Sequence, residues 1–557
     1  MTGATFSLEE IEEATGAELV SPGKGPKVLS GVSTDSRTLS VGNLFIALRG
    51  PRFDGHDFLK RAFAQGAAGV LVDRWPLETK GGLTPVKGVR PHLILKVPDT
   101  LRGLGDLARF HRNRFRPEVI AITGSTGKTT TKGMAAHLLS EKRNLLAASG
   151  TQNNQIGVPL TLLRLEAEHQ AVILELGTNQ WGEIRRLTTL VQPTVGVITN
   201  IGPAHLEAFG DLQGVLRAKG ELWEAMDPKG VLVLNGDDPL LRQAGKRLSQ
   251  RLVWFGTDPT AQVRADRIVL EEWGSRCRIN DSFEMRLSLP GRHNLMNALA
   301  ALAVCSALGE EMASAAARLE SIAPLPGRLA QVACNGFRVI DDTYNANPAS
   351  LKAALEVLRN LECSGRRILA VGDMLELGKQ AELLHAQAGR WAADSGVDLL
   401  IAVGPLARRL LSAAWEHGFP REHGWAFDTA QEAGEFLSHE VRSGDAVLLK
   451  GSRWMRMEQI LGVLEPLSKP PAAALGSNAS SARSKEETYH ENRDTATTSD
   501  EAMRRISAQP FGLRRQAAIS GVTPPRRTPG STPSSSFLGS GRLALATRLT
   551  RGFETSS

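Results

Sequence analysis

The stretch Val119-Ile-Ala-Ile-Thr-Gly-Ser-Thr-Gly-Lys-Thr-Thr-Thr131 decides the fold of this chain. Its β-branched first half predicts a buried parallel strand, and residues 132–139, which follow the stretch, predict a helix. A glycine-rich turn lies between them. Backbone N–H groups and the helix dipole at such a turn attract phosphate, a lysine adds a mobile charge, and a threonine hydroxyl can ligate Mg²⁺. We therefore expect a nucleotide phosphate at this turn.

The loop departs from the strict phosphate-loop pattern G-x-x-x-x-G-K-[ST], because Ile122 stands where the first glycine belongs. An ordinary turn between a strand and a helix is the alternative interpretation. Since the strand, the turn and the helix are all indicated in the right order, we favour phosphate binding.

The composition indicates a multidomain globular protein. A length of 557 residues with 41% hydrophobic residues predicts three or four domains with real cores. Of the net charge of +7, the segment from Pro471 onward supplies 12 Lys+Arg against 7 Asp+Glu, which is +5, so the remainder carries about +2 and no nucleic-acid partner is expected. The four cysteines lack metal-ligand spacing, which fits buried thiols in a reducing compartment.

The sequence contains no signal-peptide pattern and no apolar run of about 18 residues that would suggest a membrane span. We expect a cytoplasmic monomer without a membrane span.

Periodicity divides the chain into four segments. Residues 1–116 alternate short strands with helices, and residues 117–323 surround the phosphate loop with a parallel sheet. Residues 324–468 alternate strands and helices as in a doubly wound, Rossmann-like sheet. Residues 469–557 are rich in Ser, Thr, Pro, Ala and Arg and are predicted to be a disordered tail. The fold class is therefore α/β, with a small N-terminal domain, a central phosphate-loop NTPase-like domain and a C-terminal Rossmann-like domain.

Three polar side chains stand out in the central segment. Glu175 ends an otherwise apolar strand, where a carboxylate is costly unless it is paired or bound to a metal, and we prefer the metal to a structural ion pair. His205 follows the next strand end, where α/β sheets place their ligands, although a lone histidine is more often structural. Lys219 lies close to the apolar face of a helix, and a lysine reaching back to solvent is the plain alternative.

Other candidate sites are open to two interpretations. Residues 34–37 follow a strand in the first segment and can bind a uridine or pyrophosphate group, or form a capped turn with a surface ion pair. The polar loop 150–159 can hydrogen-bond a sugar or peptide, or be a plain loop. Asn294 precedes an Ala/Leu-rich stretch and can be a helix N-cap.

The third segment carries two further motifs. Asp341-Asp-Thr-Tyr-Asn-Ala-Asn-Pro348 lies at a predicted strand end and gathers acids, amides and one tyrosine, which indicates a site. Lys450-Gly-Ser-Arg453 follows the last predicted strand and suggests anion binding, with a basic surface turn as the alternative.

Taken in this order, the motifs resemble the Mur ligases, the ATP-dependent amide ligases of peptidoglycan precursor synthesis. The resemblance covers roughly residues 7–465 and leaves the tail outside. The loop Thr123–Thr130 looks like the phosphate loop of that family, which accounts for the missing first glycine. The stretches 342–348, 372–378 and 449–453 look like those of the members that add D-alanyl-D-alanine to UDP-N-acetylmuramoyl-tripeptide. The D-N-P-R motif of the tripeptide-forming members is absent.

The resemblance implies the following nucleotide and metal sites. The β- and γ-phosphates of ATP would be held by the loop residues Gly124, Ser125, Thr126, Gly127, Lys128, Thr129 and Thr130. Thr129 and Glu175 would bind one Mg²⁺ and His205 a second. Lys219 matches a lysine that is carbamylated in many relatives and so becomes a metal ligand. Lys128, His205 and Lys219 are thus the expected catalytic residues.

The resemblance also implies how adenine and the two peptide substrates bind. Asn294 would contact adenine, and Arg328 would close over the nucleotide together with Asp342, Tyr344 and Asn345. The uridine diphosphate would be held by Thr34, Asp35, Ser36 and Arg37. The muramoyl peptide would be held by Thr151, Asn153 and Asn154. Lys450 and Arg453 are candidates for the carboxylate of the incoming dipeptide.

Three rival functions remain open at this stage. The first is another amide ligase of the same superfamily, such as a sister Mur ligase or folylpolyglutamate synthetase. The second is a phosphate-loop ATPase or switch protein that couples hydrolysis to partner binding without forming an amide. The third is a non-catalytic homologue, against which the presence of Lys128, Glu175, His205 and Lys219 argues.

Overall fold

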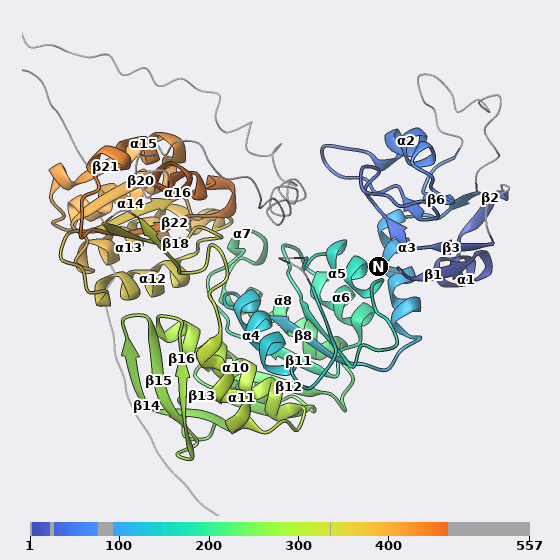
Figure 1. Cartoon of the computed structure of the whole chain (residues 1–557), viewed down its shortest axis with the longest axis horizontal. Coiled ribbons are helices and arrows are strands. Elements are labelled where there is room, and N and C mark those ends of the chain that lie inside the picture. Colours follow the sequence, from blue (N-terminus) through green and yellow to red (C-terminus); the bar gives the residue numbers. More distant parts are fainter. Residues whose placement is uncertain are drawn as a thin grey trace, which may run out of the picture. The chain divides into compact units, whose positions relative to one another are not determined.

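The computed structural model describes residues 3–22, 27–75, 93–148, 150, 152–334 and 336–465 (Figure 1). The predicted tail 469–557 lies outside the described residues, as does Thr151. The described chain forms three larger sheets and a two-stranded one. Each of the larger sheets falls within one predicted domain, although the domain bounds themselves stay a prediction.

The N-terminal sheet has the strand order β2-β7-β6-β5-β4 and is parallel except where β2 meets β7. Helix α1 follows Ser7, which forms a capping box with Glu10. The strands are β1 Thr5–Ser7, β2 Glu18–Pro22, β3 Val28–Ser30, β4 Val32–Ser33, β5 Leu44–Ile46, β6 Gly69–Val72 and β7 Leu93–Lys96. The helices are α1 Leu8–Thr15, η1 Gly55–Phe58, α2 Leu59–Ala64 and α3 Thr100–Arg112.

The central sheet has nine strands in the order β16-β15-β14-β13-β12-β11-β8-β10-β9. The strands are β8 Glu118–Thr123, β9 Leu145–Ala147, β10 Ala171–Glu175, β11 Val195–Ile198, β12 Val231–Asn235, β13 Arg251–Gly256, β14 Val263–Glu271, β15 Gly274–Ile279 and β16 Phe283–Leu287. The helices are α4 Lys128–Leu139, α5 Gly157–Leu162, α6 Glu183–Val191, α7 Leu206–Phe209, α8 Leu212–Ala225, α9 Pro239–Gly245, α10 Arg292–Ala307, α11 Met312–Arg318 and η2 Leu319–Ser321.

Strand β8 lies inside this sheet, and its side chains alternate between two cores. Val119 and Ala121 pack into the core that also contains residues of α5, α6 and α8, whereas Ile120 and Ile122 pack into the core formed with α4 and α10. Figure 1 shows α4 and α10 beside each other, and the two helices are in contact. The strand is buried on both faces, as the β-branched run predicted.

Two expectations for the central domain were wrong. The sheet is not wholly parallel, because β14, β15 and β16 form an antiparallel extension whose strands face solvent on one side and carry charged residues there. Helix α4 begins at Lys128 rather than Lys132. The β-branched Thr129–Thr131 have low helix propensity, but the turn that ends at Gly127 already places the chain in helical geometry.

The C-terminal sheet has the order β17-β18-β22-β19-β20-β21. It is parallel, as expected of a doubly wound domain, except for the antiparallel edge strand β17, which was not predicted. The strands are β17 Ala330–Cys334, β18 Phe337–Asp342, β19 Arg367–Gly372, β20 Leu399–Val403, β21 Gly424–Phe427 and β22 Ala446–Lys450. The helices are α12 Pro348–Asn360, η3 Gly378–Gln380, α13 Ala381–Asp394, α14 Pro405–Glu416, η4 Arg421–His423, α15 Ala430–Glu440, η5 Arg453–Met455 and α16 Glu458–Leu464.

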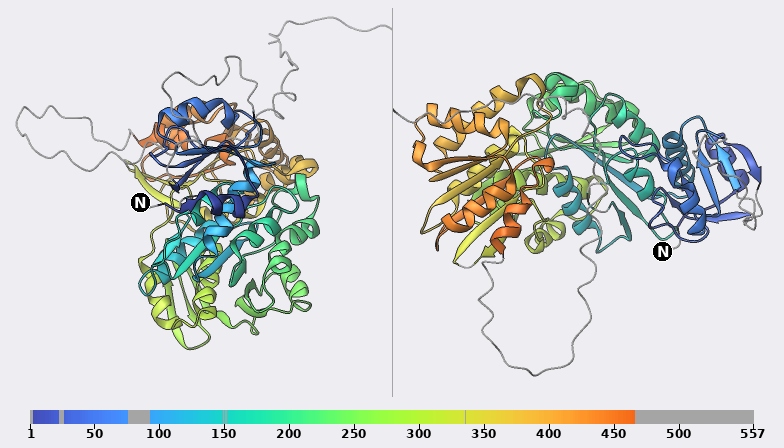
Figure 2. Two further views of the ribbon diagram at one scale, coloured as in Figure 1. Left: turned by 90° about the vertical axis from the view of Figure 1, so that its right-hand side faces the viewer. Right: turned by 90° about the horizontal axis from the view of Figure 1, so that it is seen from above.

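Helices cover both faces of the C-terminal sheet, which Figure 2 shows in yellow to orange-red. One core contains residues of α12, α13 and α14, and the other contains residues of α15 and α16. The four cysteines are free thiols, three of them buried, as their spacing predicted. No helix within the described residues is long and apolar enough to cross a membrane.

Replacing Ile122 tests whether the residue at the missing glycine position has a packing role. The Ile122 side chain is fully buried, so Ile122→Ala should lower the free energy of unfolding by about 3 kcal/mol. Urea denaturation of the variant measures this loss. Val269→Ala, at a side chain that is 44% exposed on β14, is the matched control and should change stability by less than about 0.5 kcal/mol. Equal stability of Ile122→Ala and the wild type would refute the packing role.

Candidate active site

The phosphate loop is built on two glycines with positive φ. Gly124 has φ +146° and Gly127 has φ +80°. A Cβ at Gly124 would lie 1.9 Å from Thr199 Oγ1, and a Cβ at Gly127 would lie 2.1 Å from Asn297 Oδ1. Both positions therefore require glycine, for conformation and for space. The turn between them leads directly into α4, whose N-terminal N–H groups are available to an anion.

Lys128 lies at the first position of α4 and turns back over the loop. Its Nζ donates to the carbonyl of Gly124 at 2.9 Å. Burial lowers the pKa of Lys128, and the nearby Glu175 carboxylate opposes that shift. A lysine held over its own loop can exchange the carbonyl for a phosphate oxygen.

Glu175 ends β10 beside Ile122 of β8 and is 2% exposed. Its Oε2 accepts a hydrogen bond from Thr129 Oγ1 at 2.7 Å, and its Oε1 accepts one from Asn153 Nδ2 at 2.8 Å. Burial opposes ionisation, but Lys128 and these two hydrogen bonds outweigh it and hold the pKa of Glu175 below its usual range. Within the described residues no basic group lies within ion-pair distance of this carboxylate, so the structural ion pair is not formed.

Arg328 reaches the same point from the segment that precedes the C-terminal sheet. Its Nη2 donates to Thr129 Oγ1 at 2.8 Å, and its guanidinium lies 4.2 Å from the ring centre of Tyr344. The Thr129 hydroxyl therefore connects a carboxylate of the central domain with a cation that precedes β17. Arg328 thus contacts the phosphate loop directly, and Tyr344 lies against Arg328.

His205 precedes α7 in a left-handed conformation, with φ +54°. Its Nδ1 lies 2.7 Å from Oε2 of Glu376, a residue of the C-terminal domain that the sequence did not single out. The contact with His205 holds the pKa of Glu376 below its usual range.

Lys219 lies on α8 and is 1% exposed. The alternative of a lysine reaching solvent is therefore wrong. Burial lowers the pKa of Lys219 well below its ordinary value, and Lys128 lowers it further. No carboxylate of the described residues lies within ion-pair distance of its Nζ. A lysine in these surroundings is disposed to be neutral, which is the form of an amine that reacts as a nucleophile.

Asn294 lies inside α10 rather than at its N-cap, because the helix begins at Arg292. The N-cap interpretation is therefore wrong. Its Nδ2 donates to the carbonyl of Pro290 at 2.8 Å, and Asn297, one turn later, donates to Asn294 Oδ1 at 3.3 Å. His293 beside it is half-buried, and desolvation together with the nearby Lys450 charge lowers the pKa of its ring to about 4.

Sequence reasoning missed two asparagines that hold the loop. Asn200 Oδ1 accepts hydrogen bonds from the backbone N–H and the hydroxyl of Thr126 at 3.0 and 3.1 Å. Asn297 packs its side chain against Gly127. Asn200 follows β11, so the rule that polar residues at strand ends line a site would have found it. Asn297 carried no such signal, because it lies within an apolar helix.

Two of the predicted substrate groups in the C-terminal domain are already partnered. Lys450, the last residue of β22, is 1% exposed, and its Nζ contacts Asp342 Oδ2 at 2.5 Å and the carbonyl of Asn345 at 3.0 Å. The basic surface turn is therefore wrong for Lys450. Burial raises the pKa of Asp342, although Lys450 opposes that shift. Arg453 is exposed, pairs with Glu458 at 3.4 Å and lies 5.9 Å from the ring centre of Tyr344.

The remaining predicted substrate residues have local partners. Asp35 pairs with Arg37 at 2.8 Å and also accepts a hydrogen bond from its backbone N–H, which is the capped turn that the sequence left open. Asn154 Oδ1 accepts hydrogen bonds from Ile156 and Gly157 at the start of α5. Asn153 contacts Glu175 instead of standing free.

A cavity of about 520 Å³ joins most of these residues. Its lining includes the predicted residues Ser125, Thr126, Gly127, Lys128, Thr129, Thr130, Asn153, Asn154, Glu175, His205, Asn294, Arg328, Asp342, Tyr344, Asn345 and Lys450. Gly124, Lys219, Arg453 and residues 34–37 do not line it. The cavity thus gathers the predicted nucleotide residues in one place and leaves the predicted uridine site apart.

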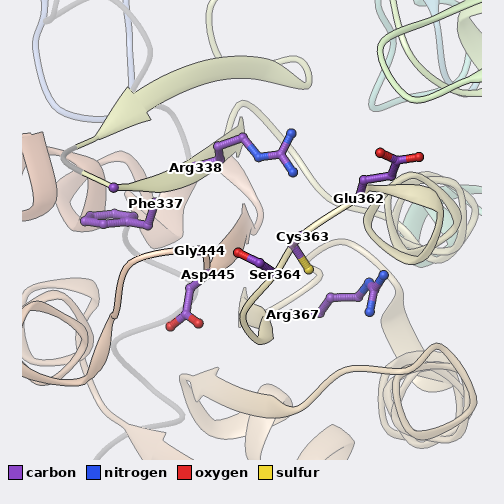
Figure 3. A pocket seen from close by; sticks show the side chains of 9 residues that line it. Phe337, Arg338, Glu362, Cys363, Ser364, Arg367, Gly444 and Asp445 are labelled. Atoms are coloured by element: carbon purple, nitrogen blue, oxygen red, sulfur yellow. The ribbon is translucent and has the colours of Figure 1, made fainter.

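A second cavity, of about 540 Å³, lies at the N-terminal ends of strands in the C-terminal sheet, and Figure 3 shows the side chains that line it. Phe337, Arg367 and Asp445 line it at or just before the first residues of β18, β19 and β22. Parallel sheets bind ligands at the carboxyl ends of their strands, and the Asp445 carboxylate is already paired with Arg366 at 2.9 Å. We therefore assign the active site to the cavity at the phosphate loop.

The residues at the loop fit Mg²⁺ in part. Thr129 and Glu175 offer a hydroxyl and a carboxylate, which are the oxygen ligands that this cation prefers, and their oxygens lie 2.7 Å apart. No group of three or more His, Cys, Asp or Glu side chains among the described residues is arranged to hold a metal alone. A magnesium ion here would need further oxygens from nucleotide phosphates.

Three family models match the chain in succession. The model described as "Mur ligase family, catalytic domain" matches residues 28–112, "Mur ligase middle domain" matches 122–305, and "Mur ligase, glutamate ligase domain" matches 327–453. The chain belongs to the Mur ligase family.

Two relatives that match most of the chain carry the same name. The UDP-N-acetylmuramoyl-tripeptide–D-alanyl-D-alanine ligase of Escherichia coli K12 is 38% identical over 444 residues, which are 78% of this chain and 94% of the relative. The protein of the same name from Bacillus subtilis 168 is 34% identical over 467 residues, 83% of this chain and 99% of the relative.

Two solved structures of MurF also match most of the chain. A crystal structure of MurF from Acinetobacter baumannii, 33% identical, matches with a TM-score of 0.74 over 84% of this chain and all of that one. MurF of Thermotoga maritima, solved in complex with ADP and 28% identical, matches with a TM-score of 0.69 over 78% of this chain and 97% of that one.

Asp373, directly after β19, is a buried acid outside the predicted site. It is 3% exposed, and its Oδ1 accepts a hydrogen bond from Ala407 N at the start of α14 at 2.7 Å. Burial raises the pKa of Asp373 to about 6, although the N–H groups of α14 oppose the shift. The folded protein therefore retains this proton between about pH 4 and pH 6, where the unfolded chain releases it.

Stability should consequently fall as pH rises through that window, because the folded state then loses a proton that it binds more tightly than the unfolded state. Asp373→Asn cannot titrate. From pH 4.5 to 7.5 the free energy of unfolding of the wild type should therefore decrease relative to that of the variant by on the order of 2 kcal/mol. Urea denaturation at both pH values measures the difference. Asp57→Asn, at an exposed carboxylate, is the control, and parallel pH profiles for wild type and Asp373→Asn would refute the assignment.

Proposed function

We propose that this protein uses ATP to join D-alanyl-D-alanine to UDP-N-acetylmuramoyl-tripeptide, giving the UDP-N-acetylmuramoyl-pentapeptide of peptidoglycan synthesis. The observation that carries the proposal is the cavity at the phosphate loop, where Lys128, Glu175 and Arg328 meet residues of the C-terminal domain. The names of the relatives, which this chain matches over most of its length, supply the substrates. We propose a cytoplasmic monomer as the active form.

The proposed reaction activates a carboxylate, which is by itself a poor acyl donor. The C-terminal carboxylate of the tripeptide attacks the γ-phosphorus of ATP, the bond from that phosphorus to the bridging oxygen breaks, and ADP leaves. The product is an acyl phosphate. The amine of D-alanyl-D-alanine then attacks the acyl carbon, loses a proton and expels phosphate as the amide forms.

The residues of this chain stabilise the charge that moves during phosphoryl transfer. Lys128 would release the Gly124 carbonyl and pair with the γ-phosphate, and the N–H groups at the start of α4 would hold the phosphate oxygens. Magnesium ions, held by Thr129 and Glu175 at one site and by His205 at a second, would neutralise charge on the phosphates. Lys219, carbamylated on its neutral amine, would add a negatively charged ligand to these sites.

The C-terminal domain supplies residues that would cover the nucleotide, which the phosphate loop alone leaves open to water. Acyl phosphates hydrolyse, so water must be excluded while the amine is in place. Arg328 already contacts Thr129 of the loop, and Asp342, Tyr344 and Asn345 line the same cavity. We propose that this group closes over the nucleotide and that Asn294 contacts its adenine.

The sites of the two acceptor substrates complete the proposal. We propose that residues 34–37 hold the uridine diphosphate and that Asn153 and Asn154, with Thr151, hold the muramoyl peptide. Since the ammonium of Lys450 is committed to Asp342, Arg453 is the better candidate for the dipeptide carboxylate, with Lys450 acting through the Asp342–Asn345 loop.

A phosphate-release assay tests the proposed function. Release should require both UDP-N-acetylmuramoyl-tripeptide and D-alanyl-D-alanine, and mass spectrometry should find one pentapeptide per phosphate. Phosphate release without the dipeptide would favour an ATPase or switch protein. Turnover with glutamate or diaminopimelate in place of the dipeptide would favour a sister ligase or a folylpolyglutamate synthetase.

Lys128→Ala should lower the rate of pentapeptide formation by at least about 10³-fold, because the phosphate loses its charged partner. The same assay measures the loss. The control is Lys229→Ala, which removes an exposed lysine of the same domain and should leave the rate unchanged. Near-normal turnover by Lys128→Ala would exclude the loop as the phosphate site.

Lys219→Ala tests the carbamylation. If Lys219 carries a carbamate, the variant should lose ligation, and a short carboxylic acid such as formate or acetate should restore part of it by entering the space of the lost group. The rate of ligation by Lys219→Ala, measured as a function of the concentration of the added acid, shows whether activity is restored. A variant that stays inactive at every acid concentration would make Lys219 a structural lysine.

A further inference from the structure

The segment between β19 and α13, residues 373–380, connects the C-terminal domain with the loop that carries His205. It contains Glu376, which has φ +65°, and it faces His205, which has φ +54°. Non-glycine residues in this region cost about 1 kcal/mol or more and persist where the surrounding structure enforces them. Two such residues in contact across two domains indicate a site rather than a chance surface pair.

The ion pair of the Glu376 side chain adds too little to the stability of the fold to offset this strain. It is 48% exposed, and an exposed ion pair contributes about 0–1 kcal/mol. The effect of the Glu376 carboxylate is on the protonation of the neighbouring His205 ring. Its Oε2 lies 2.7 Å from Nδ1 of His205, which is an ion-pair distance without hydrogen-bond geometry. An unprotonated Nδ1 would turn its lone pair toward a carboxylate that has no proton to donate, so a neutral His205 carries its proton on Nδ1. Nε2 is then the nitrogen with a free lone pair.

Backbone contacts hold Glu376 against the His205 loop. The Glu376 carbonyl accepts a hydrogen bond from Glu207 N at 3.3 Å. A Cβ at Gly378 would lie 2.8 Å from Glu207 Cα, so the backbones approach too closely for any side chain there. Gln380 Nε2 donates to the carbonyl of Gly210 at 3.4 Å. These contacts are made to Glu207 within the short helix α7 and to Gly210, the residue that follows it.

The segment is anchored just as firmly within its own domain. Met374 N donates to His385 Nε2, and Leu375 N donates to Ser452 Oγ, both at 2.9 Å. The Ser452 hydroxyl also contacts the carbonyl of Ala346 at 3.4 Å. The three stretches around residues 342–348, 372–378 and 449–453 are thus joined, and the Glu376 side chain extends from them to His205 of the central domain.

We infer that Glu376 is a positioning residue, which sets the tautomer and orientation of His205 so that Nε2 is presented as a ligand when the C-terminal domain is docked. The inference rests on the proposed function, in which His205 helps to hold a metal ion. A carboxylate that accepts a hydrogen bond from the other ring nitrogen is a recurring feature of metal-binding histidines, and its loss costs 10- to 100-fold in metal affinity. Glu376 therefore makes the second metal site dependent on contact between the two domains.

Direct metal binding tests the inference without turnover. Electron paramagnetic resonance counts Mn²⁺ bound by the enzyme together with a non-hydrolysable ATP analogue. Glu376→Ala should weaken this binding about tenfold. The matched control is Glu382→Ala, at an exposed carboxylate six residues away on α13, which should bind Mn²⁺ as the wild type does.

The His205→Ala background separates positioning from a general structural role. In that background Glu376→Ala should have no further effect, because it acts only through the imidazole. An equal loss with and without His205, or wild-type Mn²⁺ binding by a folded Glu376→Ala, would overturn the inference while leaving the proposed function in place. A wild-type enzyme that binds no Mn²⁺ beyond that held by the nucleotide would instead overturn the proposed metal site itself.

The tautomer provides a second, metal-free readout. Long-range ¹H–¹⁵N spectra of histidine-labelled protein distinguish the two ring tautomers, and the signal absent from His205→Ala identifies the residue. His205 should be protonated on Nδ1 in the wild type and should shift toward the Nε2-protonated form in Glu376→Ala. An Nε2 proton on His205 of the wild type would overturn the inference.

Discussion

The hydrogen bond between Thr129 and Glu175 is the interaction on which the rest of the site depends. It joins the helix that follows β8 to the end of β10, and it exists because the two strands are adjacent, parallel and in a register that pairs Ile122 with Glu175. Ile122, which pairs with Glu175, is packed in the apolar core, so buried hydrophobic residues support the site. Asn153 from the polar loop and Arg328 from the segment before β17 then contact the same pair of residues.

Most charged side chains of the site interact with one another and are partly or wholly removed from water. Lys128 and Glu175 oppose the effect of burial on each other, and the buried Lys450 is partnered by Asp342. Lys219 lacks a carboxylate partner within the described residues, and burial accordingly favours its neutral form. An anionic ligand and its cations would enter a site in which Lys128 and Lys219 are already desolvated, so electrostatic interactions there are stronger than on the surface.

Much of the local structure followed from the sequence. The predicted alternation of strands and helices in residues 324–468 is observed, and a proline marks the first turn of both α12 and α14. The antiparallel strands β14 to β16 were missed because their alternation is broken by charged residues and by a shift in register. Helix α15 and strand β21 were missed as well, although Thr429 and Glu432 form a capping box that marks the start of that helix.

For the site, the sequence by itself determined the phosphate loop, the acid at the end of β10 and the order of the motifs, since each depends on residues close together in the chain. Which side chains meet was decided only by the tertiary structure. Parallel pairing of distant strands brings Glu175 to Thr129, and domain packing brings Arg328 to the same hydroxyl and Glu376 to His205. Local patterns carry no information on such contacts, because they arise from strand order and register, which are set by the burial of whole sheets between helices.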